Sequence, residues 1–118
     1  MLSFGPATQI FLHVGVADMR RSFNGLSTLV RNELGEDPLS GHVFGFCNRR
    51  RNLVKLIVFD RGGYWVFSKR LEKGTFSWPR IGASSHEFTQ EELTLLLGGI
   101  DLEATKRRDW HGVKRMSM

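Results

Sequence analysis

Between residues 42 and 78 the chain is a succession of short apolar runs separated by turn residues, and this pattern constrains the fold most. Short runs rich in β-branched and aromatic residues are typical of strands, and the connections between them have the length and the Asn, Asp and Gly content of tight turns. The sequence therefore predicts an antiparallel meander with Leu53–Phe59 as its central strand. The expected strands are His42–Cys47, Leu53–Phe59, Tyr64–Arg70 and Thr75–Trp78.

A strand and a helix are expected before this meander. Gln9–Val16 alternates loosely and is typical of a strand. Asp18 is a suitable N-cap residue for a helix, and Gly35 a suitable residue to end it. The apolar positions between them recur every three or four residues, as one face of a helix requires: Met19, Phe23, Leu26, Val30 and Leu34.

A second helix is expected after the meander. Thr89 is followed three residues later by Glu92, which is the spacing of a capping box. Leu93, Leu96 and Leu97 then supply an apolar face before Gly98. The fold class predicted is α+β: one domain over residues 1–104, mainly an antiparallel meander, with both helices packed on one face of the sheet.

Length and composition agree with this fold and exclude several alternatives. A chain of 118 residues suits one hydrophobic core. A single cysteine excludes an internal disulfide and a multi-cysteine metal cage. The longest apolar runs are too short to span a bilayer, and Met1–Ile10 does not have the pattern of a signal peptide. We therefore expect a cytoplasmic protein.

The positive charge is concentrated in two parts of the chain. Residues 46–83 contain nine basic groups and two acids, and residues 106–118 contain five basic groups and one acid. Residues 84–105 contain five acids and no Lys or Arg. The basic groups include twelve Arg against five Lys, and guanidinium pairs with phosphate in a bidentate manner. A solvated surface that serves solubility is the alternative, but the distribution favours a polyanionic partner.

Phosphate binding is the strongest hypothesis at the level of residues. Three consecutive arginines occupy the expected hairpin tip at Asn48–Asn52, and further cations follow the Tyr64–Arg70 strand. Residues 105–118 are expected to be a basic, flexible arm that becomes ordered on binding. The nucleic-acid-binding residues predicted are Arg49, Arg50, Arg51, Lys69, Arg70, Lys73, Arg107 and Arg108.

Four aromatic residues interleave with these cations. Aromatic rings stack on bases in some nucleic-acid-binding proteins, but rings at alternating strand positions more often form a core. We expect Trp65, Phe67, Phe76 and Trp78 to belong to the core, on two antiparallel strands joined through Gly74 that share one aromatic face.

No catalytic residue, metal ligand or cofactor is predicted. The four histidines have no H-x₃₋₅-H spacing, and a phosphate-binding glycine loop is missing from the sequence. Cys47 lies beside the arginine run, which lowers a thiol pKa, but a half-buried inert thiol is the favoured interpretation. A metal-dependent nuclease needs converging acids, and Asp18, Asp60 and Glu72 are the candidates. Each of these acids has an ordinary role as a cap, a turn residue or an ion-pair partner.

Several ordered motifs resemble those of a known family over residues 8–101. The stretch Asp18–Leu26 resembles D-M-R-[RK]-[GS]-F-[DN]-G-L, and Asp37–Phe44 resembles D-P-x-S-G-x-[LV]-F. Asn48–Arg51 with Lys55-Leu56 resembles N-R-R-R…K-[IL]. Phe67–Pro79 resembles F-x-K-R-L-E-x-G-x-F-x-W-P, and the segment ending at Asp101 resembles E-L-x-x-L-L-x-G-I-D. Cys47 and Ala17 are the departures from the family pattern.

The family that these motifs resemble is the small accessory protein, called TnpB or Orf2, of bacterial insertion sequences of the sixty-six family. It is distinct from the RNA-guided nuclease that shares the TnpB label. The resemblance implies a non-catalytic role in transposition beside a separate transposase that carries the DNA-cleaving residues. Together with the charge distribution it predicts that the chain binds transposon DNA. The alternative is an adaptor that docks on the transposase or on another protein encoded by the element.

Overall fold

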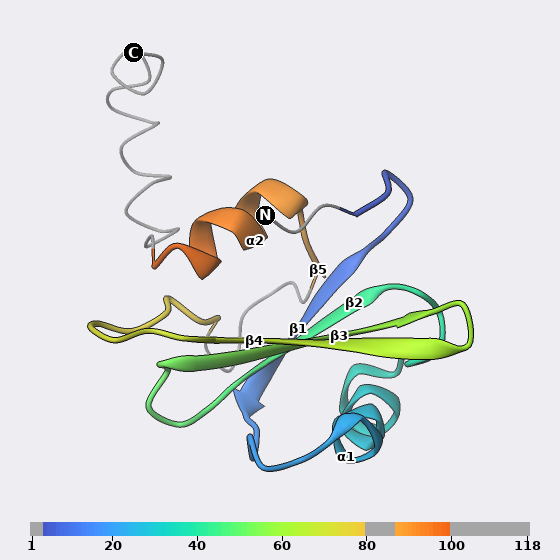
Figure 1. Cartoon of the computed structure of the whole chain (residues 1–118), viewed down its shortest axis with the longest axis horizontal. Coiled ribbons are helices and arrows are strands. Elements are labelled where there is room, and N and C mark those ends of the chain that lie inside the picture. The colour runs from blue at the N-terminus through green and yellow to red at the C-terminus, as the bar shows by residue number, and fades with distance from the viewer. Residues whose placement is uncertain (1–3, 80–86, 100–118) are drawn as a thin grey trace.

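A five-stranded sheet with the order β4-β3-β2-β1-β5 forms the centre of the molecule (Figure 1). The computed structural model describes residues 4–79 and 87–99. The strands are β1 (Ile10–Val16), β2 (Val43–Cys47), β3 (Leu53–Asp60), β4 (Gly63–Arg70) and β5 (Glu87–Phe88). The helices are α1 (Phe23–Leu29), which continues as a π-helical turn, η1 (Val30–Leu34), and α2 (Gln90–Leu97). The predicted α+β class is confirmed.

Three of the four strands expected in the meander are present and antiparallel. β2 pairs with β3, and β3 pairs with β4 in one continuous register from Leu53↔Arg70 to Asp60↔Gly63. The first strand is also present, but β1 pairs with β2 in parallel. A parallel pair needs a crossover connection, and α1 with η1 supplies it.

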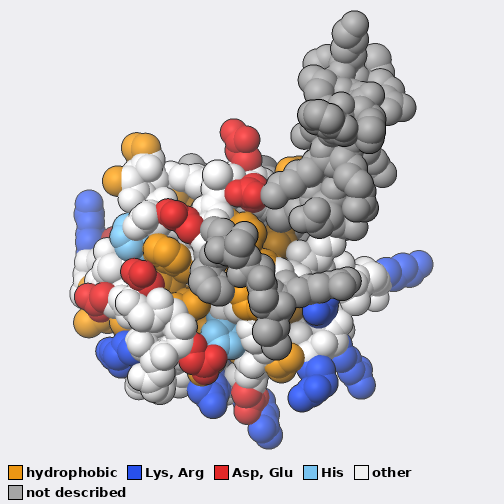
Figure 2. All heavy atoms as spheres, turned by 180° about the vertical axis from the view of Figure 1, so that it is seen from behind, with side chains coloured by type: hydrophobic (Ala, Val, Ile, Leu, Met, Phe, Trp, Pro, Cys, Tyr) orange, Lys and Arg blue, Asp and Glu red, His pale blue; other side chains and the backbone are white. Residues whose placement is uncertain are grey.

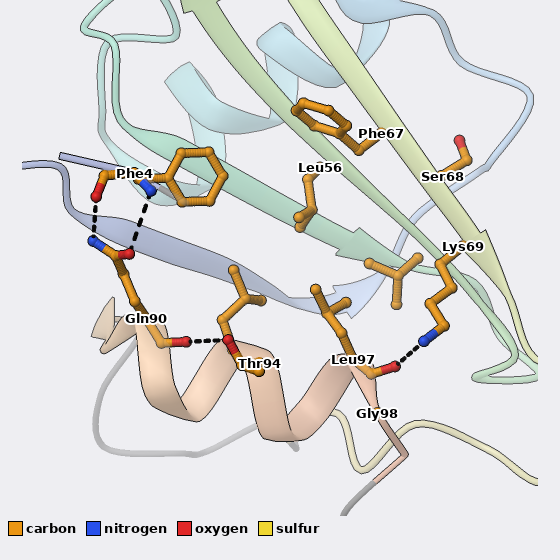
Figure 3. Close-up of a pocket in the computed structure, with 11 residues that line it drawn as sticks. Phe4, Leu56, Phe67, Ser68, Lys69, Gln90, Thr94, Leu97 and Gly98 are labelled. Atoms are coloured by element: carbon orange, nitrogen blue, oxygen red, sulfur yellow. Dashed lines mark hydrogen bonds between the residues drawn. The ribbon is translucent and has the colours of Figure 1, made fainter. Parts of the chain in front are cut away.

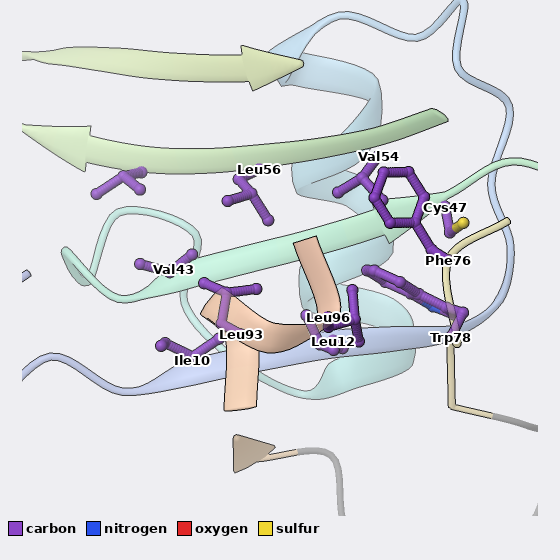
Figure 4. Close-up of a cluster of buried hydrophobic side chains, with 11 residues drawn as sticks. Ile10, Leu12, Val43, Cys47, Val54, Leu56, Phe76, Trp78, Leu93 and Leu96 are labelled. Atoms are coloured by element: carbon purple, nitrogen blue, oxygen red, sulfur yellow. The ribbon is translucent and has the colours of Figure 1, made fainter. Parts of the chain in front are cut away.

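The two helices cover opposite faces of the sheet, so the expectation that they share one face is wrong (Figure 1). On one face, Leu93 and Leu96 of α2 pack on residues such as Ile10 and Leu56 (Figure 4). On the other face, Phe23 and Leu26 of α1 pack with rings that include Phe44. A crossover helix and a helix that follows the last strand can settle on either face, and the central strands supply apolar residues to both.

The first helix begins later than expected. Its N-cap is Ser22, not Asp18, and the Ser22 side chain makes no capping hydrogen bond. The Asp18 carboxylate instead binds Arg20, through the backbone N–H at 2.9 Å and the guanidinium at 3.0 Å. A local bond of this kind competes with helix initiation and holds the preceding turn. The predicted end is confirmed, because Gly35 adopts the left-handed conformation with φ of 67°.

The second helix follows the prediction. The Thr89 hydroxyl accepts a hydrogen bond from the Glu92 N–H, and the Glu92 carboxylate accepts one from the Thr89 N–H, both at 3.0 Å. This is the reciprocal capping box. Leu93 and Leu96 are buried and Leu97 is partly buried, as expected. The sequence did not predict β5, a two-residue strand that pairs with β1 just before the cap.

Residues 75–78 are not a strand, contrary to expectation. The chain leaves β4, crosses the end of the sheet and inserts Phe76 and Trp78 into the core beneath α2 (Figure 4). Both rings are buried, as predicted, but their burial depends on insertion between the layers and not on a shared strand face. Trp65 does not belong to the core: its side chain lies on β4 and is 57% exposed, and Phe67 is half-buried.

Among the described residues, no helix has the length and apolar character needed to cross a membrane.

Candidate nucleic-acid interface

The loops that follow β1, β2 and β4 meet at one end of the sheet. β1 pairs with β2 in parallel. β2 and β4 also run in the same direction, because both are antiparallel to β3. The carboxyl ends of these strands therefore lie at the same edge. We call this region the basic end; its basic residues are Arg20, Arg21, Arg49, Arg50, Arg51, Lys69, Arg70 and Lys73, and its acids are Asp18 and Glu72.

The β2–β3 turn holds the three arginines in a fixed loop. The Asn48 carbonyl accepts the Arg51 N–H at 3.1 Å, which closes a β-turn. The Asn48 side chain also accepts the N–H groups of Asn52 and Leu53, at 3.0 and 3.1 Å. Arg49 and Arg50 are exposed at the tip, while Arg51 is half-buried. The two Asn residues of the motif thus act as the scaffold, and Arg49 and Arg50 are presented to solvent.

The segment after β4 is tied to this turn by backbone hydrogen bonds. The Leu71 N–H donates to the Asn52 carbonyl at 2.8 Å, and the Phe76 N–H donates to the Arg51 carbonyl at 2.7 Å. Arg70 pairs in register with Leu53, at the base of the hairpin. Arg70 and Lys73 are exposed. The structure therefore brings together two groups of predicted site residues, 49–51 and 69–73, that lie about twenty positions apart in sequence.

Lys69 has a partner within the protein. Its Nζ donates a 2.7 Å hydrogen bond to the carbonyl of Leu97 at the end of α2 (Figure 3). A cation at a helix C-terminus also interacts favourably with the helix dipole. The same lysine borders an apolar groove of about 540 Å³ between α2 and β4, lined by Leu56, Phe67 and Leu97 among others. Lys69 therefore has a structural role in addition to its charge.

The β1–α1 loop adds cations that the sequence analysis did not place in the site. Arg20 and Arg21 are exposed in this loop, which leaves β1 at the same end of the sheet as the hairpin arginines although it is distant from them in sequence. Hydrogen bonding by the Arg20 side chain and backbone lowers the pKa of Asp18 to about 2, so Asp18 is ionised and paired. The Lys55 Nζ donates to the Met19 carbonyl at 2.6 Å and fastens this loop to β3. Only the parallel pairing of β1 with β2 shows that this loop and the hairpin lie at the same end of the sheet.

Two of the residues weighed for catalysis and metal binding, Cys47 and His13, are buried in the fold. Burial raises the pKa of the Cys47 thiol to about 11, although the charge of Arg51 opposes this shift. Cys47 is therefore a neutral buried thiol at neutral pH, and the arginine run does not activate it. His13 is buried and its ring binds Glu33 at 2.8 Å and the Gly15 carbonyl at 3.0 Å. Within residues 4–79 and 87–99, no three metal-ligating side chains come together.

The end of the molecule opposite the basic end is acidic. The loops and helix termini there carry Glu36, Asp37, Asp60, Glu87, Glu91 and Glu92, with Arg31 in the last turn of η1 and Arg61 as counter-charges. Figure 2 shows several Lys and Arg side chains projecting from the lower right of the molecule; most Asp and Glu side chains in view lie over its left half and top, where a few Lys and Arg side chains also project. The fold thus places Asp60, which lies in sequence between the arginines 49–51 and Lys69, at the end of the sheet opposite to them. Arg107 and Arg108 lie outside the described residues.

The comparisons with known proteins agree with the motifs. The family model for IS66 Orf2-like proteins matches residues 8–107. The chain is 36% identical over 101 residues to the uncharacterized protein y4hO of Sinorhizobium fredii, covering 86% of this chain and 88% of y4hO. It is 33% identical over 106 residues to the uncharacterized protein y4jC of the same organism, covering 88% and 91% of the two chains. No solved structure gives a significant match. With its ordered motifs and this match over most of its length, the chain belongs to the IS66 Orf2-like family.

Proposed function

We propose that this protein is a non-catalytic accessory factor of transposition that binds transposon DNA through the basic end of its sheet. Membership of the IS66 Orf2-like family is consistent with an accessory role in transposition. The observation that carries the DNA proposal is the convergence of three loops and the end of β4, which together carry eight basic residues against two acids. One of those acids, Asp18, is already neutralised by Arg20.

The geometry suits contacts with the phosphate backbone. Arg49 and Arg50 project from a turn that Asn48 holds rigid, and Arg70 lies beside the base of the same hairpin. Guanidinium groups bind phosphate oxygens in a bidentate manner, and a scaffold that fixes their positions reduces the entropy lost on binding. Contacts of this kind position a protein on duplex DNA without reading its sequence. The separate transposase supplies the cleavage chemistry in this proposal.

Two arginines allow a matched test because they share one backbone conformation at opposite ends of the sheet. Arg51 in the β2–β3 turn has φ of 58°, and Arg61 in the β3–β4 turn has φ of 47°. Glycine adopts this left-handed region without steric cost, so Arg51→Gly and Arg61→Gly each remove one charge and keep the turn. Only Arg51 belongs to the basic end.

Duplex binding is measured for the parent and both variants over a series of salt concentrations. Each lost phosphate contact lowers the slope of log K against log salt by about 0.9. We expect Arg51→Gly to weaken binding and lower the slope by this amount, and the triple variant Arg49→Ala, Arg50→Ala, Arg51→Gly to lower it by about two to three units. Arg61→Gly should leave the slope unchanged. Equal losses in both single variants, or no loss in the triple variant, would remove the hairpin from the interface.

A protein adaptor is the second candidate, and the acidic end of the molecule favours it. Glu91 on α2 is exposed, and Leu95 on the same helix is 37% exposed. A helix surface with one exposed leucine among carboxylates can dock on a basic partner such as a DNA-binding transposase. Gel shifts with element-end DNA and with unrelated duplex, run with and without purified transposase, separate the candidates. Binding that requires transposase favours the adaptor, while binding to element ends without it favours the DNA-binding role.

A further inference from the structure

In the part of the chain that the structure describes, β4 is an edge strand of the sheet with no further strand beside it. It is the terminal strand in the described sheet, it has eight residues, and it pairs with β3 without a bulge from Asp60↔Gly63 to Leu53↔Arg70. Proteins usually protect such an edge with a short strand, a proline, a bulge or a central charge. The opposite edge is protected in this way, because β5 has only two residues, one of them Glu87. β4 has none of these features before Lys69.

One hydrogen bond identifies which backbone groups of β4 face away from β3. The Leu71 N–H points toward β3, since it donates to the Asn52 carbonyl. Successive residues of a strand point their backbone groups to opposite sides, so alternate residues from Leu71 backwards also face β3. The residues of β4 whose backbone N–H and C=O groups face away from β3 are therefore Tyr64, Val66, Ser68 and Arg70.

Large apolar side chains are exposed along this edge. The exposed fractions are 53% for Tyr64, 57% for Trp65 and 40% for Val66. The Tyr64 ring stacks on Phe23 of α1 with the ring centroids 4.0 Å apart, and Trp65 stacks on Phe67 at 5.9 Å. The rings are thus held in place on both faces of the strand. Ordered apolar surface costs little further entropy when it is covered.

We propose that β4 pairs antiparallel with β4 of a second copy of this chain, about a two-fold axis at Phe67. In this register Val66 lies opposite Ser68 of the second copy, and Tyr64 lies opposite Arg70 of the second copy. All four outward residues then form backbone hydrogen bonds, and each face of the sheet continues into the same face of the second copy.

The charge pattern of the strand favours this partner and this direction. The strand has an aromatic half, Tyr64–Phe67, and a basic half that ends in Lys69 and Arg70. Antiparallel pairing sets the basic half of each copy against the aromatic half of the other, where cation–π contacts are favourable. Parallel pairing would set like charges side by side, which is destabilising. The strand is therefore complementary to itself in one direction only.

The first experiment compares two valine substitutions by sedimentation equilibrium on the full chain. Val66→Lys puts a charge in the middle of the edge strand β4, next to the proposed seam, and Val16→Lys makes the same change at an exposed position, 56% accessible, at the end of β1. We expect the parent and Val16→Lys to approach twice the 13.5 kDa chain mass with rising concentration. Val66→Lys should raise the dissociation constant at least about tenfold. A parent that stays at monomer mass, or equal association by both variants, would overturn the proposal.

A second measurement does not depend on a variant that must fold. Residue-resolved amide hydrogen exchange of the parent is recorded at low and high protein concentration. The amides of Tyr64, Val66 and Ser68 should gain protection at high concentration, while that of Trp65, bonded to β3, should change little. Equal behaviour of all these amides would contradict edge pairing.

Disulfide trapping tests the direction of pairing. Directly opposite strand residues have Cα atoms about 5.5 Å apart, within the range that a disulfide spans. An equimolar mixture of Val66→Cys and Ser68→Cys chains should form the mixed dimer in preference to either self-dimer. Preference for the self-dimers would overturn the antiparallel arrangement. Cys47 does not interfere, because its side chain is buried. None of these measurements requires DNA, so their outcome is separate from that of the DNA-binding proposal.

Discussion

The indole Nε1 of Trp78 donates a 2.7 Å hydrogen bond to the backbone carbonyl of His13, a residue 65 positions earlier in the chain. This bond joins the segment that follows β4 to the first strand of the sheet. The Trp78 ring is 5% exposed and packs in the cluster beneath α2. The residue therefore closes the core at the end of the sheet where the basic loops meet.

Two substitutions of Trp78 should lower the free energy of unfolding by different amounts. Trp78→Phe keeps a ring but leaves the His13 carbonyl without its donor, and we expect a loss of about 1–3 kcal/mol. Trp78→Ala removes the ring as well and should cost about 3–5 kcal/mol. Chemical denaturation of both variants measures the losses. If Trp78→Ala unfolds like the parent but abolishes transposition in cells, the ring is a contact residue and its assignment to the core is wrong.

Gly45 lies against three side chains of the core, those of Leu12, Leu56 and Trp78, and leaves no room for a side chain of its own. A Cβ at Gly45 would lie 2.6 Å from a methyl carbon of Leu12, 3.0 Å from one of Leu56 and 3.3 Å from the Trp78 ring. We expect Gly45→Ala to cost about 1–3 kcal/mol, the usual penalty for overpacking a core. Gly63→Ala is the matched control, because its Cβ would meet only the Asp60 carbonyl oxygen at 3.9 Å. Equal denaturation midpoints for the two variants would contradict the close packing of these core side chains on Gly45 of β2.

Lys69 and Arg70 should differ in their effect on the fold. Lys69→Ala removes the hydrogen bond to the Leu97 carbonyl, and we expect a loss of about 0.5–1.5 kcal/mol. Arg70→Ala removes an exposed side chain and should stay within about 0.5 kcal/mol of the parent. Both variants should impair transposition if their charges hold DNA. Thermal melting beside a transposition assay in cells checks both effects; normal transposition would restrict the DNA contacts to Arg49–Arg51 and other loops.

Stability should fall at high pH because of Cys47. Burial raises the pKa of its thiol from 9.0 to about 11, so the folded protein favours the neutral form more than the unfolded chain does. The stability linked to this group is fully present below about pH 9 and is lost as the pH rises toward 11. Denaturation of the parent and of Cys47→Ala between pH 8 and 11 measures it, and we expect a flatter pH dependence for the variant. Parallel curves for the two proteins would show that Cys47 is not responsible.

The sequence determined the local elements of this protein. Turn residues at Asn48–Asn52 and Asp60–Gly63 define the two hairpins, and the Thr89–Glu92 capping box defines the start of α2. These features depend on hydrogen bonds and backbone conformations within a few residues, so the pattern of neighbours predicts them. The start of α1 was mispredicted because Asp18 binds Arg20 locally instead of capping the helix. The strand expected at 75–78 was mispredicted because apolar alternation does not distinguish a strand from a segment that inserts two rings into a core.

Only the tertiary structure decided where the charges meet. The arginines of the hairpin were identified from sequence, but parallel pairing of β1 with β2 places Arg21 at the same end of the sheet, and the register of β4 brings Arg70 to the base of the hairpin. The face that each helix covers and the exposure of Trp65 likewise depend on strand order, which places Trp65 on an edge. Strand order results from burial of apolar surface between residues distant along the chain, so a local pattern carries little information about it.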